Sequence, residues 1–391
     1  MQENAKPDIN LPVTIQPVFI KGGLKMRISK KPRKSKQKTK MSFGSKGCLG
    51  VDITPTAINM VHLAGSVPGN LRLENYTIQP LPKGVIINGN IEDHDQLVSY
   101  LQQAYQQLGS SCKNVTAALP QALTNIQTIT YDARSSDLPV DEFVELEASQ
   151  TIGSDNLSYD FQVTAELQNG NVQEIVMAAA KRDDVDLRTD LFADADIPLS
   201  QLDVDTFAVV NAFSVWIDQF APDLEHQKLA IFHVDEDQTK ALILQNGNIV
   251  YKQETNFGNK QLTHNIQRQY KLSEDDAWSM RFKSNKPADF QGTVADHFNS
   301  QLTQEIQRVL QFYYTTVSSD YQDSVKHILI SGCPFMQPFG LAKSVYAQTN
   351  ISTQQVEPIS STQGGKQAET SKFNLESGQL TVAFGLAVRG L

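Results

Sequence analysis

The feature that most constrains the fold is a pattern of strand, aspartate, polar turn and return strand that occurs twice. In residues 48–63 an apolar strand ends at Asp52, and Thr54 to Thr56 break the run before the next apolar strand. Residues 228–251 repeat this order around Asp235. Turn N–H groups and hydroxyls beside a carboxylate form a candidate site for phosphate and Mg²⁺. One copy alone is more often produced by an aspartate that caps its own turn.

A third apolar strand, at residues 325–332, ends in a small-residue turn. In this order the three segments resemble the actin and sugar-kinase ATPase fold. In that fold, two related domains each contribute an aspartate hairpin that holds the phosphates, and a glycine-rich turn after a late strand takes the adenosine. The resemblance implies an α/β protein with a two-domain, ribonuclease-H-like, actin-like fold.

Six further segments follow one another along the chain: Gly50–Ile53, Asn114–Pro120, Val144–Gln150, Ala178–Arg182, Leu202–Ala208 and Val382–Arg389. In this order they resemble one branch of that superfamily, the type IV pilus assembly PilM family, over residues from about 47 to 391. The resemblance implies a subdomain of the PilM and FtsA type, inserted in the first half. It implies docking there, because PilM-like proteins bind the N-terminal peptide of PilN between this insert and the first unit.

The strand and helix periodicities fit this division. Alternation at residues 71–78 predicts a strand, and residues 97–108 have the spacing of a helix that Gly109 ends. We expect four parts: a disordered basic extension at 1–46, a first actin-like unit at 47–119 and 201–226, the insert at 120–200, and a second half at 227–391 with a helical insertion at about 259–324. Strands are also expected at 126–131, 199–204 and 326–331, and helices at 139–152, 183–195, 336–348 and 379–389, with a long amphipathic helix from Phe298 to Val317.

Composition excludes several classes of protein. The chain has no run of about 18 apolar residues, which a membrane-spanning helix needs. Its three cysteines, Cys48, Cys112 and Cys333, are widely spaced, which is typical of core thiols in a reducing cytoplasm. The charge is divided: residues 1–40 hold 11 basic and 2 acidic residues, and the remainder is acidic. We therefore expect no nucleic-acid binding by the folded body.

The basic segment allows three interpretations. It is a solvated tail, an upstream extension of a protein that begins at Met26 or Met41, or a contact with anionic lipid. The string Ile9-Asn-Leu-Pro12 raises a separate hypothesis, because PilN of this family begins with a similar Ile-Asn-Leu-Leu-Pro-like peptide. The string is either a chance match or a self-docking tail that competes with the partner.

The resemblance assigns ATP with Mg²⁺ to the two hairpins and the late turn, and it assigns no catalytic residue. The expected nucleotide contacts are Asp52, Thr54, Thr56, Asn59, Asp205, Asp235, Thr239, Ser331 and Gly332, with Asp52 and Asp235 on the metal. Asp203 and Asp205 are both candidates for the acidic residue that faces the nucleotide. Asp205 is alternatively the N-cap of the following helix.

The sequence also departs from the family pattern in these turns. Thr54 replaces a glycine and Asn59 replaces a lysine in the first hairpin, and Asp237 replaces a glycine in the second. Pro334 removes an N–H from the adenosine turn. Glycine permits close approach of backbone to phosphate, and Asp237 adds negative charge. These changes predict weak nucleotide binding and argue against efficient hydrolysis.

The resemblance therefore implies a cytoplasmic adaptor of type IV pilus assembly. Its expected partner is a PilN-like inner-membrane protein, which would recruit it to that membrane through an N-terminal peptide. It would link the motor ATPases of the pilus to the inner-membrane alignment complex. Two alternatives stay open: an active ATPase or small-molecule kinase of the same fold, and a filament-forming protein like FtsA.

Overall fold

The computed structural model describes residues 47–66, 69–87, 89–167, 170–283, 285–318, 324–333, 340–363 and 371–391. The predicted basic extension at 1–46, its Ile9–Pro12 string and Pro334 lie outside these residues. In the described part of the chain, no helix is both long and apolar enough to cross a membrane.

The first sheet has five strands in the order β10-β6-β1-β2-β3. The strands are β1 (Cys48–Ile53), β2 (Ala57–Ser66), β3 (Asn70–Pro80), β6 (Val115–Leu119) and β10 (Leu199–Val204). β1 and β2 are antiparallel, whereas β6 runs parallel to both β1 and β10. The carboxyl ends of β1, β6 and β10 therefore meet at one edge, with Asp52 and Asp203 near it.

The second sheet repeats this arrangement in the order β13-β12-β11-β14-β15. Its strands are β11 (Leu229–Val234), β12 (Thr239–Gln245), β13 (Asn248–Thr255), β14 (His327–Ser331) and β15 (Ser352–Gln355). β11 is antiparallel to β12 and parallel to β14. The same topology therefore brings Asp235 and Ser331 to one edge. β15 is a strand that the sequence analysis did not predict.

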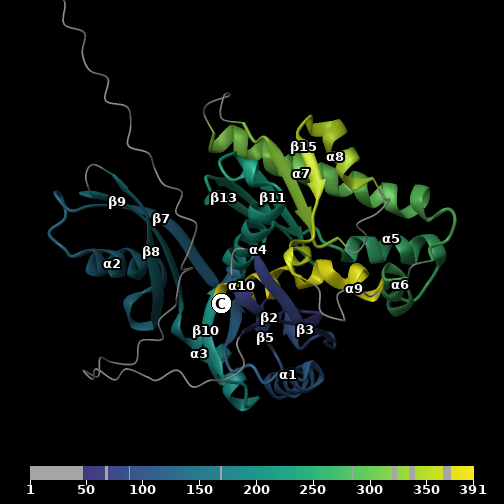
Figure 1. Ribbon diagram of the computed structural model, residues 1–391, viewed down its shortest axis with the longest axis horizontal. Coiled ribbons are helices and arrows are strands. Elements are labelled where there is room, and N and C mark those ends of the chain that lie inside the picture. Colours follow the sequence, from purple (N-terminus) through teal and green to yellow (C-terminus); the bar gives the residue numbers. More distant parts are fainter. Residues whose placement is uncertain are drawn as a thin grey trace, which may run out of the picture.

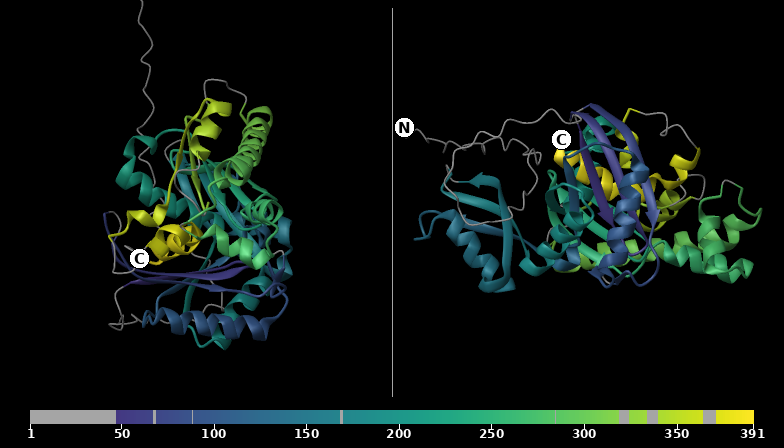
Figure 2. Two further views of the ribbon diagram at one scale, coloured as in Figure 1. Left: turned by 90° about the vertical axis from the view of Figure 1, so that its right-hand side faces the viewer. Right: turned by 90° about the horizontal axis from the view of Figure 1, so that it is seen from below.

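Two helices cover the two faces of the first sheet (Figure 2, left). The helix α1 (His94–Leu108) begins at the N-cap Asp93 and ends at Gly109, which has a left-handed φ of 63°. Its stripe of Leu97, Leu101 and Leu108 packs against one face. The helix α10 (Thr381–Gly390) packs Ala383, Phe384 and Ala387 against the other face. The predicted helix at 379–389 thus begins at residue 381, after a 3₁₀ turn at Ser377–Leu380.

α10 also lies against α4 (Asp205–Phe220), which connects the two halves. A Cβ on Gly385 would lie 1.8 Å from the backbone oxygen of Ala208 in α4. A Cβ on Gly50 of β1 would lie 1.9 Å from the backbone oxygen of Ala383 in α10. Glycine at these two positions is what allows β1, α10 and α4 to approach so closely.

The residues between β6 and β10 form a separate three-stranded sheet with the order β7-β9-β8. Its elements are β7 (Thr124–Asp132), α2 (Val140–Ile152), β8 (Leu157–Leu167) and β9 (Val172–Lys181), whereas the next helix, α3 (Arg182–Asp194), packs Val185, Leu191 and Phe192 into the core of the first sheet. α2 covers one face of the three-stranded sheet through Val144 and Ala148. Figure 1 shows the unit at one end of the molecule, opposite the helices α5 and α6.

The remaining described helices belong to the part of the chain after β13, apart from short 3₁₀ turns. They are α5 (Lys260–Tyr270), α6 (Glu274–Arg281), α7 (Asp296–Thr316), α8 (Leu341–Thr349) and α9 (Ser371–Glu376). Two small strands, β4 (Ile86–Ile87) and β5 (Asn90–Ile91), precede α1. The predicted stripe of α7 is buried from Phe298 to Tyr313. Val317 is an exception: it lies just past the last turn and is 49% exposed. The predicted helix start at residue 336 lies outside the described residues.

Candidate functional site

Asp52 ends β1 in a buried position, and its partner lies on the return strand. The register of β1 and β2 sets Asp52 opposite Asn59, whose Nδ2 donates a hydrogen bond of 3.3 Å to Asp52 Oδ2. Burial and the nearby charge of Asp235 raise the pKa of Asp52 to about 7. This carboxyl is therefore partly protonated near neutral pH. Because the charge of Asp235 acts on Asp52, the two predicted aspartates lie near each other.

Asp235, at the equivalent place after β11, is held in its ionised form. Its Oδ2 accepts a hydrogen bond of 3.0 Å from Lys240 Nζ, and its Oδ1 lies 3.0 Å from His233 Nε2. Burial alone would raise the pKa of Asp235, but Lys240 and His233 outweigh burial and hold this pKa well below its usual range.

Lys240 is the centre of the charged cluster, and the sequence analysis missed it. Its Nζ lies 3.0 Å from Asp235, 3.3 Å from Asp205 Oδ2 and 3.6 Å from Glu254 Oε1. Burial alone would lower the pKa of Lys240, but the three carboxylates hold it well above its usual range. The available signal was a single lysine inside the otherwise apolar strand Thr239–Gln245, whose described residues are nearly all buried.

Asp205, and not Asp203, faces this cluster. The N-cap of α4 is Val204, so the alternative that Asp205 is the N-cap is wrong. Asp205 Oδ1 accepts a hydrogen bond of 3.1 Å from the N–H of Gln121, and Oδ2 faces Lys240. Asp203 turns instead toward Arg389, whose Nε is 3.4 Å from Asp203 Oδ2. Burial raises the pKa of Asp203 to about 6, although Arg389 opposes the shift.

A second buried cation, Arg188 on α3, lies in the same region. It is 2% exposed, and its Nη2 donates a hydrogen bond of 2.7 Å to the backbone oxygen of Gly89. Its Nη1 has no hydrogen-bond partner among the described residues. Burial lowers the pKa of Arg188 to about 10, opposed by Asp184, Asp205 and Asp52. α3 therefore places a cation near the hairpin in which Asn59 stands where the resemblance implies a lysine.

The predicted hydroxyl ligands of the two hairpins make contacts within the protein. Thr54 Oγ1 donates to the backbone oxygen of Ala57 at 2.9 Å and accepts from the N–H of Ala57 at 3.0 Å. Thr56 Oγ1 lies 3.5 Å from Thr54 Oγ1. Thr239 Oγ1 donates to the backbone oxygen of Phe257 at 2.6 Å. None of these contacts requires a ligand.

The late turn is likewise tied to the second sheet. Ser331 Oγ is 2.9 Å from His233 Nδ1. Gly332 has a φ of +87°, and a Cβ there would lie 2.3 Å from the backbone oxygen of Val234. Asn259 Nδ2 donates 2.9 Å hydrogen bonds to the backbone oxygens of Val234 and Gly332. Packing alone therefore explains the glycine in this turn.

The acidic residues of the second turn are paired within the second half. Glu236 accepts two hydrogen bonds, of 2.6 and 2.8 Å, from Nη1 of Arg281, which is 1% exposed. Asp237 Oδ1 lies 3.2 Å from Lys260 Nζ. The charge that the sequence analysis expected Asp237 to present to phosphate is thus balanced by Lys260.

These donors do not fit a divalent metal in the arrangement observed. Mg²⁺ requires near-octahedral oxygen ligands, and the described residues contain no group of three or more His, Cys, Asp or Glu side chains that could hold a metal ion. Lys240 already neutralises Asp235, and Asp52 pairs with Asn59. The assignment of Mg²⁺ to Asp52 and Asp235 stays a prediction, and the donor set argues against it.

Glu357, beside the late turn, provides a test of this region by pH. It is 8% exposed, and neither carboxylate oxygen has a hydrogen-bond partner in the described part of the chain. Burial raises the pKa of Glu357 from 4.5 to about 8. The unfolded chain loses this proton near pH 4.5 but the folded chain holds it until about pH 8, so this group makes the fold less stable as pH rises through that window.

We expect Glu357→Gln to remove this loss of stability at higher pH. The free energy of unfolding of the native chain should fall between pH 5 and pH 8 by on the order of 2 kcal/mol more than that of the variant. Urea unfolding at both pH values measures the difference. The exposed Glu142→Gln serves as the control and should leave the pH dependence unchanged. An identical pH dependence in native chain and Glu357→Gln would contradict the assignment.

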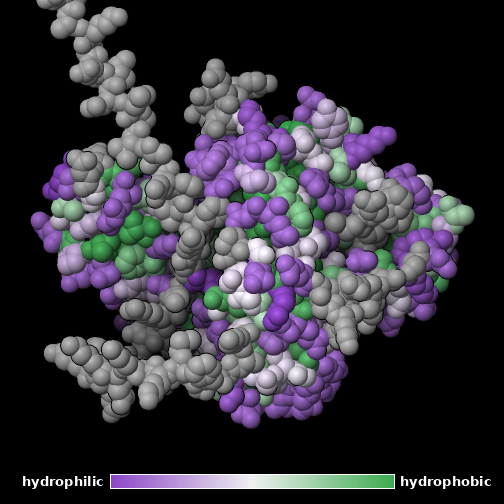
Figure 3. Space-filling view, in the orientation of Figure 1, coloured by the Kyte–Doolittle hydropathy of each residue, from purple (hydrophilic) through white to green (hydrophobic). Residues whose placement is uncertain are grey.

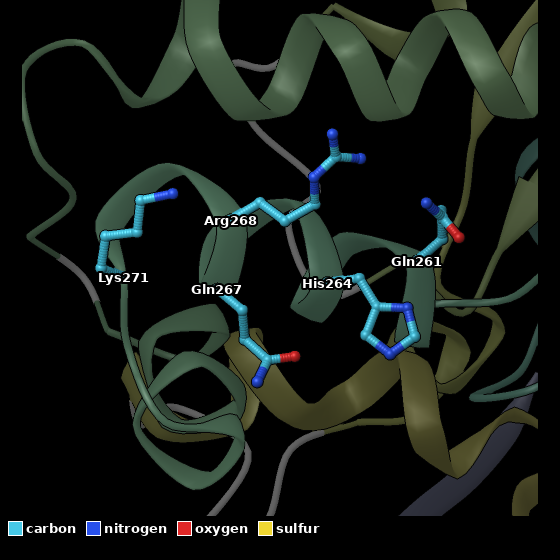
Figure 4. Close-up of a pocket in the computed structure, with 5 residues that line it drawn as sticks. All are labelled: Gln261, His264, Gln267, Arg268 and Lys271. Carbon is cyan, nitrogen blue, oxygen red and sulfur yellow. The ribbon is translucent and has the colours of Figure 1, made fainter.

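Two hollows lie away from the charged cluster. One, of 420 Å³, follows α5 and is lined by Gln261, His264, Gln267, Arg268 and Lys271 (Figure 4). It contains none of the predicted site residues. The other, of 280 Å³, lies between the inserted sheet, the start of α4 and the edge strand β13. Ile126, Val176, Phe207 and Ile249 form its apolar part.

Comparison with known proteins agrees with this architecture. The family described as "Type IV pilus assembly protein PilM" matches residues 50–391. A chain of a "PilM-PilN type IV pilus biogenesis complex" is 19% identical with a TM-score of 0.70, covering 88% of this chain and 98% of that one. Ethanolamine utilization protein EutJ from Carboxydothermus hydrogenoformans is 11% identical with a TM-score of 0.50, covering 87% and 88%. The predicted actin-like α/β fold is confirmed.

Proposed function

Since the chain belongs to the type IV pilus assembly protein PilM family, we propose that it is an adaptor that binds the N-terminal peptide of a PilN-like inner-membrane protein. That partner recruits it from the cytoplasm to the inner membrane, where it links the motor ATPases to the alignment complex. The likeness to a chain from a PilM–PilN complex supports this partner.

The observation that carries the proposal is the 280 Å³ pocket beside the insert. The face of the inserted sheet opposite α2 supplies Ile126, Thr128 and Val176 to it. Phe207 at the start of α4 closes the base, and Ile249 of β13 forms the opposite wall. The pocket therefore joins the insert to both halves, and an occupant contacts all three.

β13 suits this pocket to an extended peptide. Among the strands that the structure describes, it is an edge strand that pairs only with β12, and its residues 248–252 line the pocket. An edge strand offers backbone N–H and C=O groups to an added strand, while alternate side chains of the peptide enter pockets. We infer that the partner peptide adds to β13 and places apolar side chains against Ile126 and Val176.

A charge at the centre of this wall tests the docking site. Val176→Asp is expected to weaken binding of a synthetic PilN-like N-terminal peptide at least about tenfold, because peptide side chains would be buried against an unpaired carboxylate. Fluorescence anisotropy of labelled peptide on the full chain measures the affinity. Circular dichroism checks that the variant is folded.

The matched control changes a residue of α2, the helix that covers the opposite face of the same sheet. Figure 3 shows apolar side chains gathered on the insert over α2 and β8, and Leu146 of α2 is 48% exposed. Leu146→Asp should leave peptide affinity unchanged. If Leu146→Asp weakens binding and Val176→Asp does not, the peptide docks on the α2 side, and the pocket assignment fails.

For the nucleotide, we propose weak binding of ATP between Asp52 and Asp235 without efficient turnover. The hydroxyl of Thr54 is engaged within its own turn, that of Thr239 donates to Phe257, and Asn59 occupies the place of the family's lysine. Nucleotide, where bound, would set the angle between the halves. Calorimetry with Mg²⁺-ATP should show no binding tighter than about 100 μM. Turnover stimulated by Mg²⁺ and a small-molecule substrate would instead support an ATPase or kinase.

A further inference from the structure

We propose that the Lys240 ammonium takes the role of a divalent metal in the charged cluster. It holds carboxylates from both halves of the molecule together. This inference concerns the charged cluster alone and does not depend on the pilus adaptor role.

The strand register fixes the position of Lys240. In the second sheet, Lys240 pairs with His233 of β11 on one side and with Glu254 of β13 on the other. Since paired residues across neighbouring strands lie on the same face, the ammonium is delivered to the row that also presents Asp235, two residues beyond His233. Its distances to Asp235 and Glu254 are 3.0 and 3.6 Å.

The third carboxylate comes from the first half of the molecule. Asp205 begins α4, and its Oδ2 lies 3.3 Å from Lys240 Nζ. The other oxygen of Asp205 accepts the N–H of Gln121, so its side chain is oriented from the first half. Lys240 therefore forms an ion pair that joins the second half of the molecule to the first.

Burial makes this ion pair effective. The side chains of Lys240 and Asp205 are 9% and 11% exposed, so solvent and salt screen their attraction little. Lys240 carries one positive charge against three carboxylates, and the carboxylates lose their compensating charge if it is removed. Removing Lys240 would leave one buried carboxylate, Asp205, and two partly buried ones, Asp235 and Glu254, without this ammonium. Such a cluster would either open or take up a cation from solution.

The proposal predicts that a metal cation binds where the Lys240 ammonium has been removed. We expect Lys240→Gln to bind one Mn²⁺ beside Asp205, Asp235 and Glu254 about tenfold or more tightly than the native full chain does, because oxygen-rich anionic sites bind such ions. Electron paramagnetic resonance of free Mn²⁺ measures occupancy. Hydrogen exchange at the start of α4 should increase in the metal-free variant and decrease when Mn²⁺ is added.

Lys260→Gln is the matched control, because Lys260 pairs with Asp237 in the same hairpin but is half exposed. It should gain no Mn²⁺ site and leave exchange in α4 unchanged. A native chain that binds Mn²⁺ as tightly as Lys240→Gln, or a Lys240→Gln chain that gains no site, would overturn the proposal.

A second variant covers the case in which Lys240→Gln does not fold. The double variant Lys240→Gln with Asp205→Asn removes one charge of each sign, so the proposal expects it to fold. If the double variant also fails to fold, packing of the lysine stem is the cause and the proposal is wrong. Lys240→Arg keeps the cation and should stay free of Mn²⁺.

Discussion

Replacing Gly385 by alanine is expected to destabilise the chain by about 3–5 kcal/mol, enough to abolish folding at 37 °C if the native chain is only marginally stable. In an exposed helix this change would stabilise by about 1 kcal/mol, because alanine has the higher helix propensity. Here the added Cβ would lie 1.8 Å from the backbone oxygen of Ala208. Steric repulsion between α10 and α4 therefore outweighs the gain in propensity.

Gly292→Ala provides the comparison, because a Cβ at Gly292 has no heavy atom within 4 Å. Urea unfolding of both variants, with the yield of soluble chain, measures the contrast. We expect Gly292→Ala to match or slightly exceed the native stability. Equal stability of the two variants would mean that α10 and α4 do not cross at Gly385.

Glu236→Ala is expected to cost about 3–5 kcal/mol, because it leaves a buried guanidinium without its counter-ion. Arg281 is 1% exposed, and Glu236 is its partner in two of the hydrogen bonds of Nη1, at 2.6 and 2.8 Å. The third, to Thr263 Oγ1 at 3.0 Å, carries no compensating charge. The free energy of unfolding in urea gives the cost directly.

The neighbouring residue supplies the control for this prediction. Asp237→Ala removes the exposed pair with Lys260 in the same turn and should cost less than about 1 kcal/mol. The double variant Glu236→Ala with Arg281→Met removes both charges and should recover much of the loss. A double variant as unstable as Glu236→Ala alone would show that the turn itself, and not the unpaired charge, is responsible.

Local patterns were sufficient to predict the elements that carry a strong signal. The apolar residues of β1 and β11 lead to an aspartate at or just past the strand end, so the sequence located both hairpins, and Gly109 gave the end of α1. β15 was missed because Ser352–Gln355 is short, polar and at a sheet edge. Its pairing depends on β14, a neighbour in space that no local pattern in these residues indicates.

The contacts of the charged cluster were less predictable from the sequence, because they join residues that are far apart along the chain. The sequence indicated Asp205 and Asp235, but nothing local shows that one lysine contacts both. Asp237 appeared as a charge directed at phosphate, and its pairing with Lys260 appears only once α5 is placed. The hydroxyl of Thr239 is similarly committed to Phe257, which lies on the loop after β13.

The position of α10 has a consequence for how the protein is made. The helix covers one face of the sheet that begins with β1, yet it is synthesised more than 300 residues later. During translation the apolar side chains of Val61, Leu63 and Leu71 on that face lack the helix that covers them in the finished protein. We therefore expect the first sheet to keep an uncovered apolar face, open to aggregation, until residues 381–390 leave the exit tunnel.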